Sequence, residues 1–441
     1  MRRTTLLCAI ALVATAPFAP RVDTARAQPS PSLRKAYQRA DAYLHYSVGR
    51  LMELQGMMSE ALVQYRRAAN ADPGECAIDV AVGRILFTLG RFEEARAEVE
   101  GALEECPDNP EAAHLLGAIA LSEGDPETTE SVMRARAALP DAPTESTLLL
   151  AQSLLAQDRV AEAEEALRSR AETDTASPRL AHMHARTLLA LEREEDALDV
   201  LLRVHRVVPD DTAIVELASR LLASLGRTGE AAEMLDSFLG TPKARARHAL
   251  TLTRLHAGAG NRDEALRAAR RGLRKFGETA ALLRALGSVQ FEAGMVDESL
   301  ESYERALELD PDSAQALNFL AYTLADLDID AERAVELARR AVEVEPESGI
   351  IRDTMGWAYF RVGRLEEAEQ EIRKAIELGA EDPVILEHLG DVLYALGRKA
   401  EAIRAWERAL ADSPDGGSAA GKIKKARAER STGPSPSGET D

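Results

Sequence analysis

Residues 76–109, CAIDVAVGRILFTLGRFEEARAEVEGALEECPDN, form a 34-residue unit that recurs along the chain. If the first unit begins at Ala42, the next starts follow at 34-residue intervals as far as residue 314. One inserted residue near Asp328 moves the last two starts to residues 349 and 383, and eleven units fill residues 42–416. A repeat of this length indicates a stack of similar supersecondary structures, so we expect no second globular domain.

Each unit has the pattern of two antiparallel α-helices whose backbones lie close together. Positions 8 and 20 of the unit are small, as at Gly83 and Ala95, and position 24 is large and apolar, as at Val99. Small side chains let the paired helices approach, and the large one fills the remaining space. Gly90 at position 15 predicts a left-handed residue that ends the first helix, and Pro107 at position 32 predicts the end of the second.

This combination, with a further alanine at position 27, resembles the tetratricopeptide repeat over residues 42–416. The resemblance implies an all-α, right-handed superhelical solenoid of about eleven 34-residue helix–turn–helix repeats. It also implies that the first helix of each unit lines a concave groove, into which positions 2, 5, 9 and 12 point. The last three units are similar to a recurring C-terminal block of bacterial cell-envelope members of this family.

The chain begins with the pattern of a secretory signal peptide. Arg2 and Arg3 precede a short apolar run, and Ala25-Arg26-Ala27 is a small-residue cleavage motif. We expect residues 1–27 to be removed after Ala27, which predicts a periplasmic or secreted protein.

Three further segments flank or follow the array. We expect residues 28–41 to be a lead-in that turns helical near Leu33, residues 417–430 to be a capping helix, and residues 431–441 to be a disordered tail.

Two cysteines follow the predicted cleavage site, and an oxidising compartment would permit them to pair. Cys76 starts one predicted helix, and Cys106 ends its antiparallel partner. The sequence leaves both a disulfide and two free thiols open, and a Cα separation above roughly 7 Å would exclude the bond.

Position 9, on the predicted groove face, is arginine in five of the first seven units. Stacked units would align these side chains as a ladder that binds the carboxylates of an acidic peptide or a chain terminus. Ion pairs with glutamates of the protein itself are the alternative. The five residues are Arg50, Arg84, Arg186, Arg220 and Arg254.

Toward the C-terminus the predicted groove residues become aromatic and polar. Asn318, Tyr322, Trp357 and Tyr394 are candidate contacts for an extended peptide or for sugar rings. Packing between adjacent units is the alternative for the aromatic side chains. A basic cluster between Lys243 and Lys275 either docks an anionic partner or is a solvated helix face.

Composition and motifs exclude several functions. The chain has 54 Lys and Arg against 74 Asp and Glu, a net charge of −20, which argues against general binding of nucleic acid or anionic membranes. No stretch after the signal peptide is apolar enough to span a bilayer. The histidines lack metal-binding spacing, and nucleotide-binding and catalytic motifs are absent, so we expect neither a cofactor nor an enzyme.

The sequence therefore predicts a non-catalytic protein–protein interaction scaffold of the bacterial envelope that binds extended, acidic partner segments in its groove. Two alternatives stay open: a glycan-handling scaffold of polysaccharide export or assembly, and a regulatory subunit of an enzyme complex. Binding that weakens with salt would favour the arginine ladder, and salt-insensitive binding would favour aromatic stacking.

Overall fold

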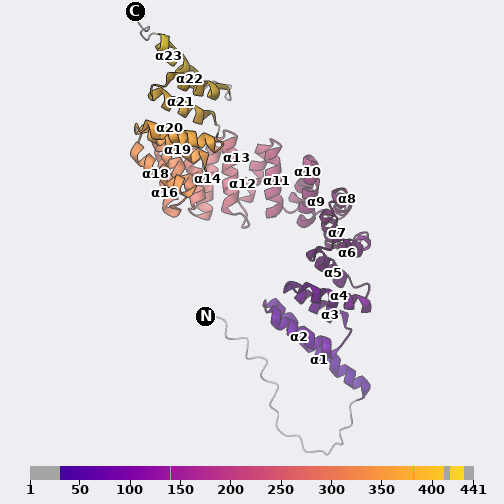
Figure 1. Cartoon of the computed structure of the whole chain (residues 1–441). Helices are drawn as coiled ribbons and strands as arrows, with labels where there is room; N and C mark the ends of the chain where they lie inside the picture. Colours follow the sequence, from indigo (N-terminus) through magenta and orange to yellow (C-terminus); the bar gives the residue numbers. More distant parts are fainter. Residues whose placement is uncertain (1–29, 140, 381, 412–417, 432–441) are drawn as a thin grey trace, which may run out of the picture. The chain divides into compact units, whose positions relative to one another are not determined.

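The computed structural model describes residues 30–139, 141–380, 382–411 and 418–431. Over these residues the chain is an all-α repeat solenoid without strands, built from helices that pair as antiparallel hairpins (Figure 1). Its contacts divide it into two compact units, residues 1–174 and 175–441. The predicted signal peptide, most of the predicted tail and residues 412–417 at the end of the repeat array lie outside the described residues.

The first unit contains four helical hairpins. Its helices are α1 (Pro31–Leu54), α2 (Met58–Ala71), α3 (Cys76–Thr88), α4 (Phe92–Glu105), α5 (Pro110–Ser122), α6 (Pro126–Ala137), α7 (Thr144–Ala156) and α8 (Val160–Ala171).

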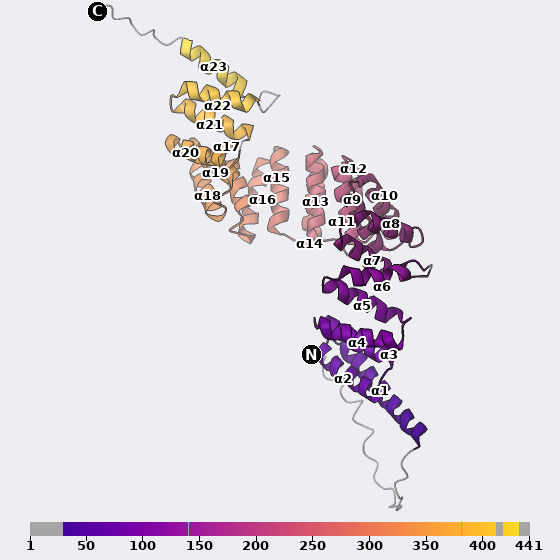
Figure 2. The same cartoon turned by 45° about the vertical axis from the view of Figure 1, so that its right-hand side comes forward.

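The second unit continues the pattern and ends with a single helix after the last hairpin (Figure 2). Its helices are α9 (Pro178–Ala190), α10 (Glu194–His205), α11 (Thr212–Ser224), α12 (Thr228–Phe238), α13 (Ala246–Gly258), α14 (Arg262–Phe276), α15 (Ala280–Glu292), α16 (Val296–Leu309), α17 (Ala314–Asp326), α18 (Ala331–Val344), α19 (Gly349–Arg361), α20 (Leu365–Glu377), α21 (Pro383–Ala395), α22 (Lys399–Ala411) and α23 (Ala419–Ser431).

Position 8 is where the two helices of a hairpin come closest. A Cβ atom added to Gly83 would lie 2.5 Å from Cγ2 of Val99, and one added to Gly356 would lie 2.5 Å from Cγ1 of Ile372. Both partners occupy position 24, so the predicted pairing of a small and a large residue is confirmed. A larger residue at position 8 would push the helices apart.

The predicted left-handed residue is present at position 15 of every hairpin among the described residues. Eight hairpins use glycine there, with φ between +73° and +79°. The other three use Asp158, Glu192 and Asp328, with φ of 59°, 57° and 54°. The glycine pattern does not predict these three turns. Aspartate adopts the left-handed conformation more readily than most L-residues, whereas glutamate adopts it rarely.

The inserted residue of the ninth 34-residue repeat is accommodated in the turn between α17 and α18. The turn is one residue longer there, and Asp330 becomes the N-cap of α18 by accepting a hydrogen bond from the Arg333 backbone N–H at 3.1 Å. The insertion therefore changes a loop and leaves both helices intact.

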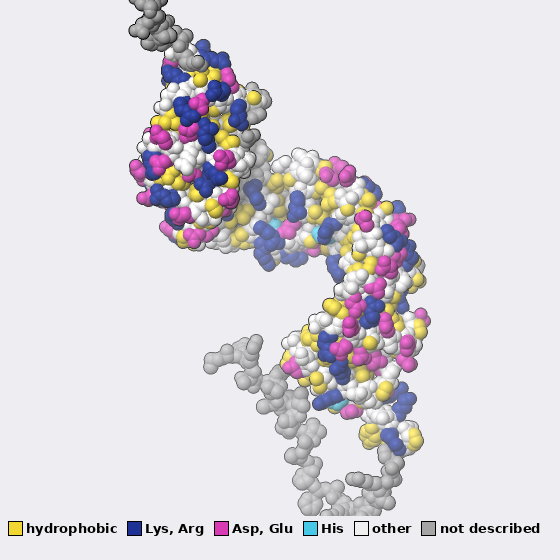
Figure 3. Space-filling view, in the orientation of Figure 1, with side chains coloured by type: hydrophobic (Ala, Val, Ile, Leu, Met, Phe, Trp, Pro, Cys, Tyr) yellow, Lys and Arg dark blue, Asp and Glu magenta, His cyan; other side chains and the backbone are white. Residues whose placement is uncertain are grey.

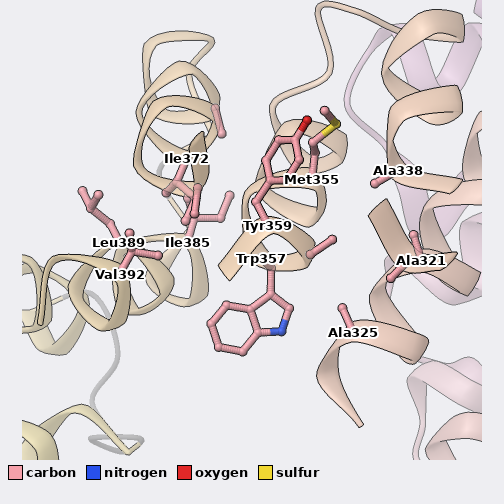
Figure 4. Packing of buried hydrophobic residues seen from close by; sticks show 14 of the residues in the cluster. Ala321, Ala325, Ala338, Met355, Trp357, Tyr359, Ile372, Ile385, Leu389 and Val392 are labelled. Carbon is pink, nitrogen blue, oxygen red and sulfur yellow. The ribbon is translucent and has the colours of Figure 1, made fainter. Parts of the chain in front are cut away.

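Within each unit, successive hairpins also pack on one another, and their buried residues form several apolar clusters. Around α19, Trp357 and Tyr359 lie between alanines of the preceding hairpin and Ile385, Leu389 and Val392 of the following one (Figure 4).

The first unit contains a disulfide. Cys76 at the start of α3 is bonded to Cys106 at the end of α4, with a Cα–Cα distance of 6.4 Å. The bond resolves the choice that the sequence left open and closes the α3–α4 hairpin at its open end.

Candidate arginine-lined binding face

In the first unit, position 9 is exemplified by Arg84 on α3. Its guanidinium forms an ion pair with Glu53 of α1, and its Nε lies 3.5 Å from Oε1 of Glu111 on α5. Glu53 is position 12 of the preceding 34-residue repeat, and Glu111 is position 2 of the following repeat. Positions 2, 9 and 12 therefore lie on one face shared by successive first helices, as the predicted groove requires.

Glu53 binds three groups at once on this face. Besides Arg84, it accepts hydrogen bonds from Nη1 of Arg50 at 3.1 Å and from the hydroxyl of Tyr65 at 2.7 Å. Burial favours the neutral carboxyl, but these hydrogen bonds and charges outweigh it and lower the pKa of Glu53. Arg50 and Arg84 are thus engaged by the protein's own carboxylates, which is the alternative that the sequence left open for them.

The second unit presents the same position differently. Arg186 on α9, Arg220 on α11 and Arg254 on α13 are exposed, and none forms an ion pair with any carboxylate that the structure describes. All three occupy the same position on the first helix of their hairpins, directly after a buried position-8 residue. Those buried residues are Ala185, Ser219 and Thr253.

The neighbouring positions explain the difference. Arg84 pairs with Glu53, which is position 12 of the preceding repeat. The residues at position 12 of the repeats before Arg220 and Arg254 are Leu189 and Ala223, which carry no charge. Position 2 of the following repeat, which is Glu111 next to Arg84, is alanine or arginine after each of these three arginines. These residues are Ala213, Arg247 and Ala281.

Glu216 is an acidic residue on this arginine-lined face, and it is already occupied. It accepts a hydrogen bond from Nε of Arg247 at 2.6 Å, and its oxygen lies 2.8 Å from Nε2 of the buried His248. Partial burial favours its neutral form, but the two hydrogen bonds outweigh this and lower the pKa of Glu216. Burial, reinforced by the charge of Arg186, lowers the pKa of His182 on the same face.

The basic cluster between Lys243 and Lys275 lies in the loop before α13 and on α13 and α14, in the part of the molecule where Figure 3 shows Lys and Arg side chains gathered. Several of its side chains have partners within the protein: Arg267 pairs with Glu264, Arg271 pairs with Asp236, and Nζ of Lys275 donates to the Thr241 carbonyl at 2.7 Å. These contacts favour the reading of α14 as a solvated helix face.

Two of the predicted aromatic contacts have partners within the protein. Trp357 is 7% exposed and stacks on His388 at 4.1 Å between ring centroids and on Phe360 at 4.9 Å. The Tyr394 hydroxyl donates to Glu429 of α23. Trp357 packs between hairpins, which corrects the prediction for that residue, whereas Tyr394 is half-buried, helps to hold the last helix and stays a predicted contact.

Asn318 and Tyr322 do lie together in a hollow, a cavity of about 480 Å³ lined by α17, α19 and α21. Oδ1 of Asn318 is buried there without a hydrogen-bond partner among the described residues. Phe319, Ile350 and Val384 give the cavity an exposed apolar rim. Sequence reasoning missed these three, although exposed apolar residues at position 2, as in Ile350 and Val384, were a visible signal.

Comparison with known proteins agrees with this architecture. Three family models described as tetratricopeptide repeat match residues 54–119, 145–169, 250–348 and 354–419, together more than half of the chain. The chain belongs to the tetratricopeptide repeat family. A TPR repeat-containing protein of Pseudomonas aeruginosa is 32% identical over 157 residues, which are 34% of this chain. The match spans 26% of the length of that relative.

Solved tetratricopeptide and other structures resemble the chain at low identity. The Cut9–Hcn1 hetero-tetramer of the APC/C gives a TM-score of 0.46 at 14% identity, covering 88% of this chain and 84% of that one. A tetratricopeptide repeat protein of Parabacteroides merdae gives 0.46 at 15% identity, covering 56% and 97%. At these TM-scores the likenesses carry no argument, so the assignment depends on the sequence models and the hairpins.

Tetratricopeptide repeat proteins are in general non-catalytic interaction scaffolds. Within the residues that the structure describes, no helix has both the length and the apolar character required to cross a membrane. In the same ranges, no cluster of three or more His, Cys, Asp or Glu is arranged to hold a metal ion.

Proposed function

We propose that this tetratricopeptide repeat protein is a non-catalytic scaffold of the bacterial envelope that holds an acidic, extended segment of a partner protein. One observation carries the proposal: Arg186, Arg220 and Arg254 are exposed at the same position of successive first helices and lack a carboxylate partner among the described residues. A guanidinium binds a carboxylate through two parallel hydrogen bonds, and several such contacts along an extended chain add their affinities.

The test is the binding of a fluorescent Asp/Glu-rich peptide to the full chain by anisotropy. Replacing Arg186, Arg220 and Arg254 together with Ala should weaken binding about 100-fold, because three charge contacts of about 1 kcal/mol each are lost. Affinity for the unmodified protein should also fall as salt rises.

The matched control replaces Arg50 and Arg84 with Ala at the same repeat position. Since both are already paired within the protein, this variant should keep its affinity for the peptide. Equal binding by the triple variant and the unmodified chain would contradict the proposal.

The cavity at Asn318 gives the groove a second contact of different chemistry. An apolar side chain of the partner would contact Phe319, Ile350 and Val384, and a backbone N–H of the partner would donate to the unpartnered Asn318 oxygen. The preferred segment therefore combines acidic residues with an apolar one.

The glycan alternative has less support, because the burial of Trp357 removes the largest ring that could stack on a sugar. Competition by a neutral oligosaccharide that displaces the acidic peptide would favour it. Nothing observed in the structure favours a regulatory role in an enzyme complex.

A periplasmic or secreted location is part of the proposal. It is supported by the signal-peptide pattern of residues 1–27 and by the Cys76–Cys106 bond, since disulfides persist in oxidising compartments. N-terminal sequencing of the protein from a periplasmic extract should begin at Gln28. Recovery of the chain in the cytosolic fraction with residues 1–27 intact would contradict it.

A further inference from the structure

The helix α1 carries a second apolar stripe that nothing in the described chain covers. Its large members are 48 to 78% exposed, and they are Leu33, Tyr37, Leu44, Leu51 and Leu54. The exposed Ala40 and Ser47 complete the series, so that successive members are spaced alternately four and three residues apart. A sustained alternation of this kind is the signature of helix-to-helix packing in a coiled coil.

This stripe lies on the side of α1 opposite its own hairpin partner. Ala42 and Gly49 are buried, and Gly49 faces the ring of Tyr65 on α2. Leu44 and Leu51 follow them by two residues, which is roughly 200° around an α-helix. The first turns of α1 also project beyond α2, because Arg39 already pairs with Asp72 at the end of that helix (Figures 1 and 2).

Inside the array, the repeat positions that Leu44 and Leu51 occupy are buried between successive repeats. Leu44 and Leu51 are positions 3 and 10 of the first 34-residue repeat. Their counterparts in the second repeat, Ile78 and Ile85 on α3, are 5% and 1% exposed. α3 packs there against α2. The stripe on α1 is therefore an inter-repeat contact surface that lacks its other half.

The other end of the described array is closed. Helix α23 packs against α22 and buries Ala419, Ile423 and Ala426, with exposed fractions of 2%, 7% and 0%. Its Lys422 also pairs with Glu387 and Asp391 of α21. In the described residues, the last hairpin is therefore covered by a further helix, whereas the first helix of the first hairpin is not, and an identical α1 is the surface of matching chemistry that a second copy presents.

We propose that two copies of the chain pair through α1 about a two-fold axis, forming an antiparallel two-helix contact. The five large side chains expose on the order of 600 Å² per helix, so that a pair buries about 1,200 Å², the lower bound for stable interfaces. In the antiparallel register that sets Leu44 opposite Ser47 of the second copy, Leu51 lies opposite Ala40, so that large side chains meet small ones in the middle of the contact. Parallel packing would leave cavities where small residues meet each other.

The test is the mass of the purified chain by light scattering over a range of concentrations. The unmodified protein should have twice the mass of one chain, and Leu44→Glu with Leu51→Glu should halve that mass without loss of helicity. The matched control, Val207→Glu, introduces a charge at another exposed apolar residue, 60% exposed, and should remain dimeric.

A second measurement identifies the occupant. Hydrogen exchange on α1 should slow with increasing protein concentration in the unmodified chain and should be concentration-independent in the double variant. A monomer at every concentration would overturn the proposal, whether α1 is exposed or is covered by residues 1–29 or by another protein. Binding of the acidic peptide should be unchanged in the Leu44/Leu51 variant, so this proposal and the proposed function can fail separately.

Discussion

Arg84 in the first unit and Arg220 in the second occupy the same position of the same repeat, yet their surroundings differ. Arg84 lies between Glu53 and Glu111, whereas the corresponding neighbours of Arg220 are Leu189 and Arg247. One arginine joins successive repeats, and the other has no carboxylate partner among the described residues. A repeat position thus fixes where a side chain points, and the residues of the adjacent repeats decide whether it is free.

The two compact units also differ in how far their charged groups and cysteines are used to hold the unit itself together. Charged groups on the face of the first unit are used internally, and its α3–α4 hairpin is closed by a disulfide. The second unit contains no cysteine and leaves three guanidinium groups on its face without carboxylate partners among the described residues. We therefore expect changes in the first unit to affect stability and changes in the second to affect binding.

The largest effect should come from opening the disulfide. Replacing Cys76 and Cys106 with Ser should destabilise the α3–α4 hairpin by about 3 kcal/mol, because a closed loop of this size restricts the unfolded chain. Hydrogen exchange on α3 and α4 measures this, and helices α11 to α16 in the same sample are the control. Equal protection with and without the bond would show that the first unit does not depend on it.

Replacing Glu53 with Ala should cost about 2 kcal/mol in the first unit, because Arg50, Arg84 and Tyr65 lose a shared acceptor in a partly buried site. Hydrogen exchange on α1 to α3 is the measurement. Glu60→Ala on α2, an exposed carboxylate, is the control and should change little.

The same carboxylate gives the first unit a pH dependence. Since the folded pKa of Glu53 is lowered, its contribution is fully present above the unfolded value of about 4.3 and is lost as the pH falls through the folded pKa. The loss of stability in α1 to α3 on acidification below about pH 4 should be smaller in the Glu53→Ala variant. An identical acid profile in both proteins would contradict this assignment.

The comparison can be reversed by giving the second unit the carboxylate that it lacks. Ala223 occupies the position relative to Arg254 that Glu53 occupies relative to Arg84. Ala223→Glu should weaken binding of the acidic peptide about tenfold, or 1.4 kcal/mol, by pairing with Arg254. Ala223→Gln adds the same volume without charge, and a loss as large in that variant would indicate steric obstruction.

The smallest effect separates stability from binding within the second unit. Glu192 has a φ of 57° in the α9–α10 turn, so Glu192→Gly should stabilise that hairpin by about 1 kcal/mol. The opposite exchange, Gly226→Ala at a φ of +75° in the next hairpin, should destabilise by a similar amount. Hydrogen exchange on α9 to α12 measures both, and the affinity for the peptide should stay the same.

The hairpin fold was predictable because its determinants are local. Gly83 against Val99 and the glycine turns act within one unit, so the 34-residue spacing reveals them directly. The non-glycine turns at Asp158 and Glu192 were not predictable, since their conformation is imposed by the two helices that they join.

The candidate site was predictable only in part. The position-9 arginines were found by counting along the repeat, but Arg84 and Trp357 were assigned to the ligand although the protein itself engages them. Glu111 and His388, which contact these two residues, lie 27 and 31 positions further along the chain.

The sequence by itself determined the number of hairpins and where each begins and ends, because these depend on backbone conformation and side-chain size within a single repeat, and the family resemblance implied which positions face the groove. Only the tertiary structure decided which equivalent residues stay charged, exposed and unpaired. Burial and ion pairing are properties of neighbours, and the neighbours of a side chain in a solenoid belong to the adjacent repeats that stack upon it.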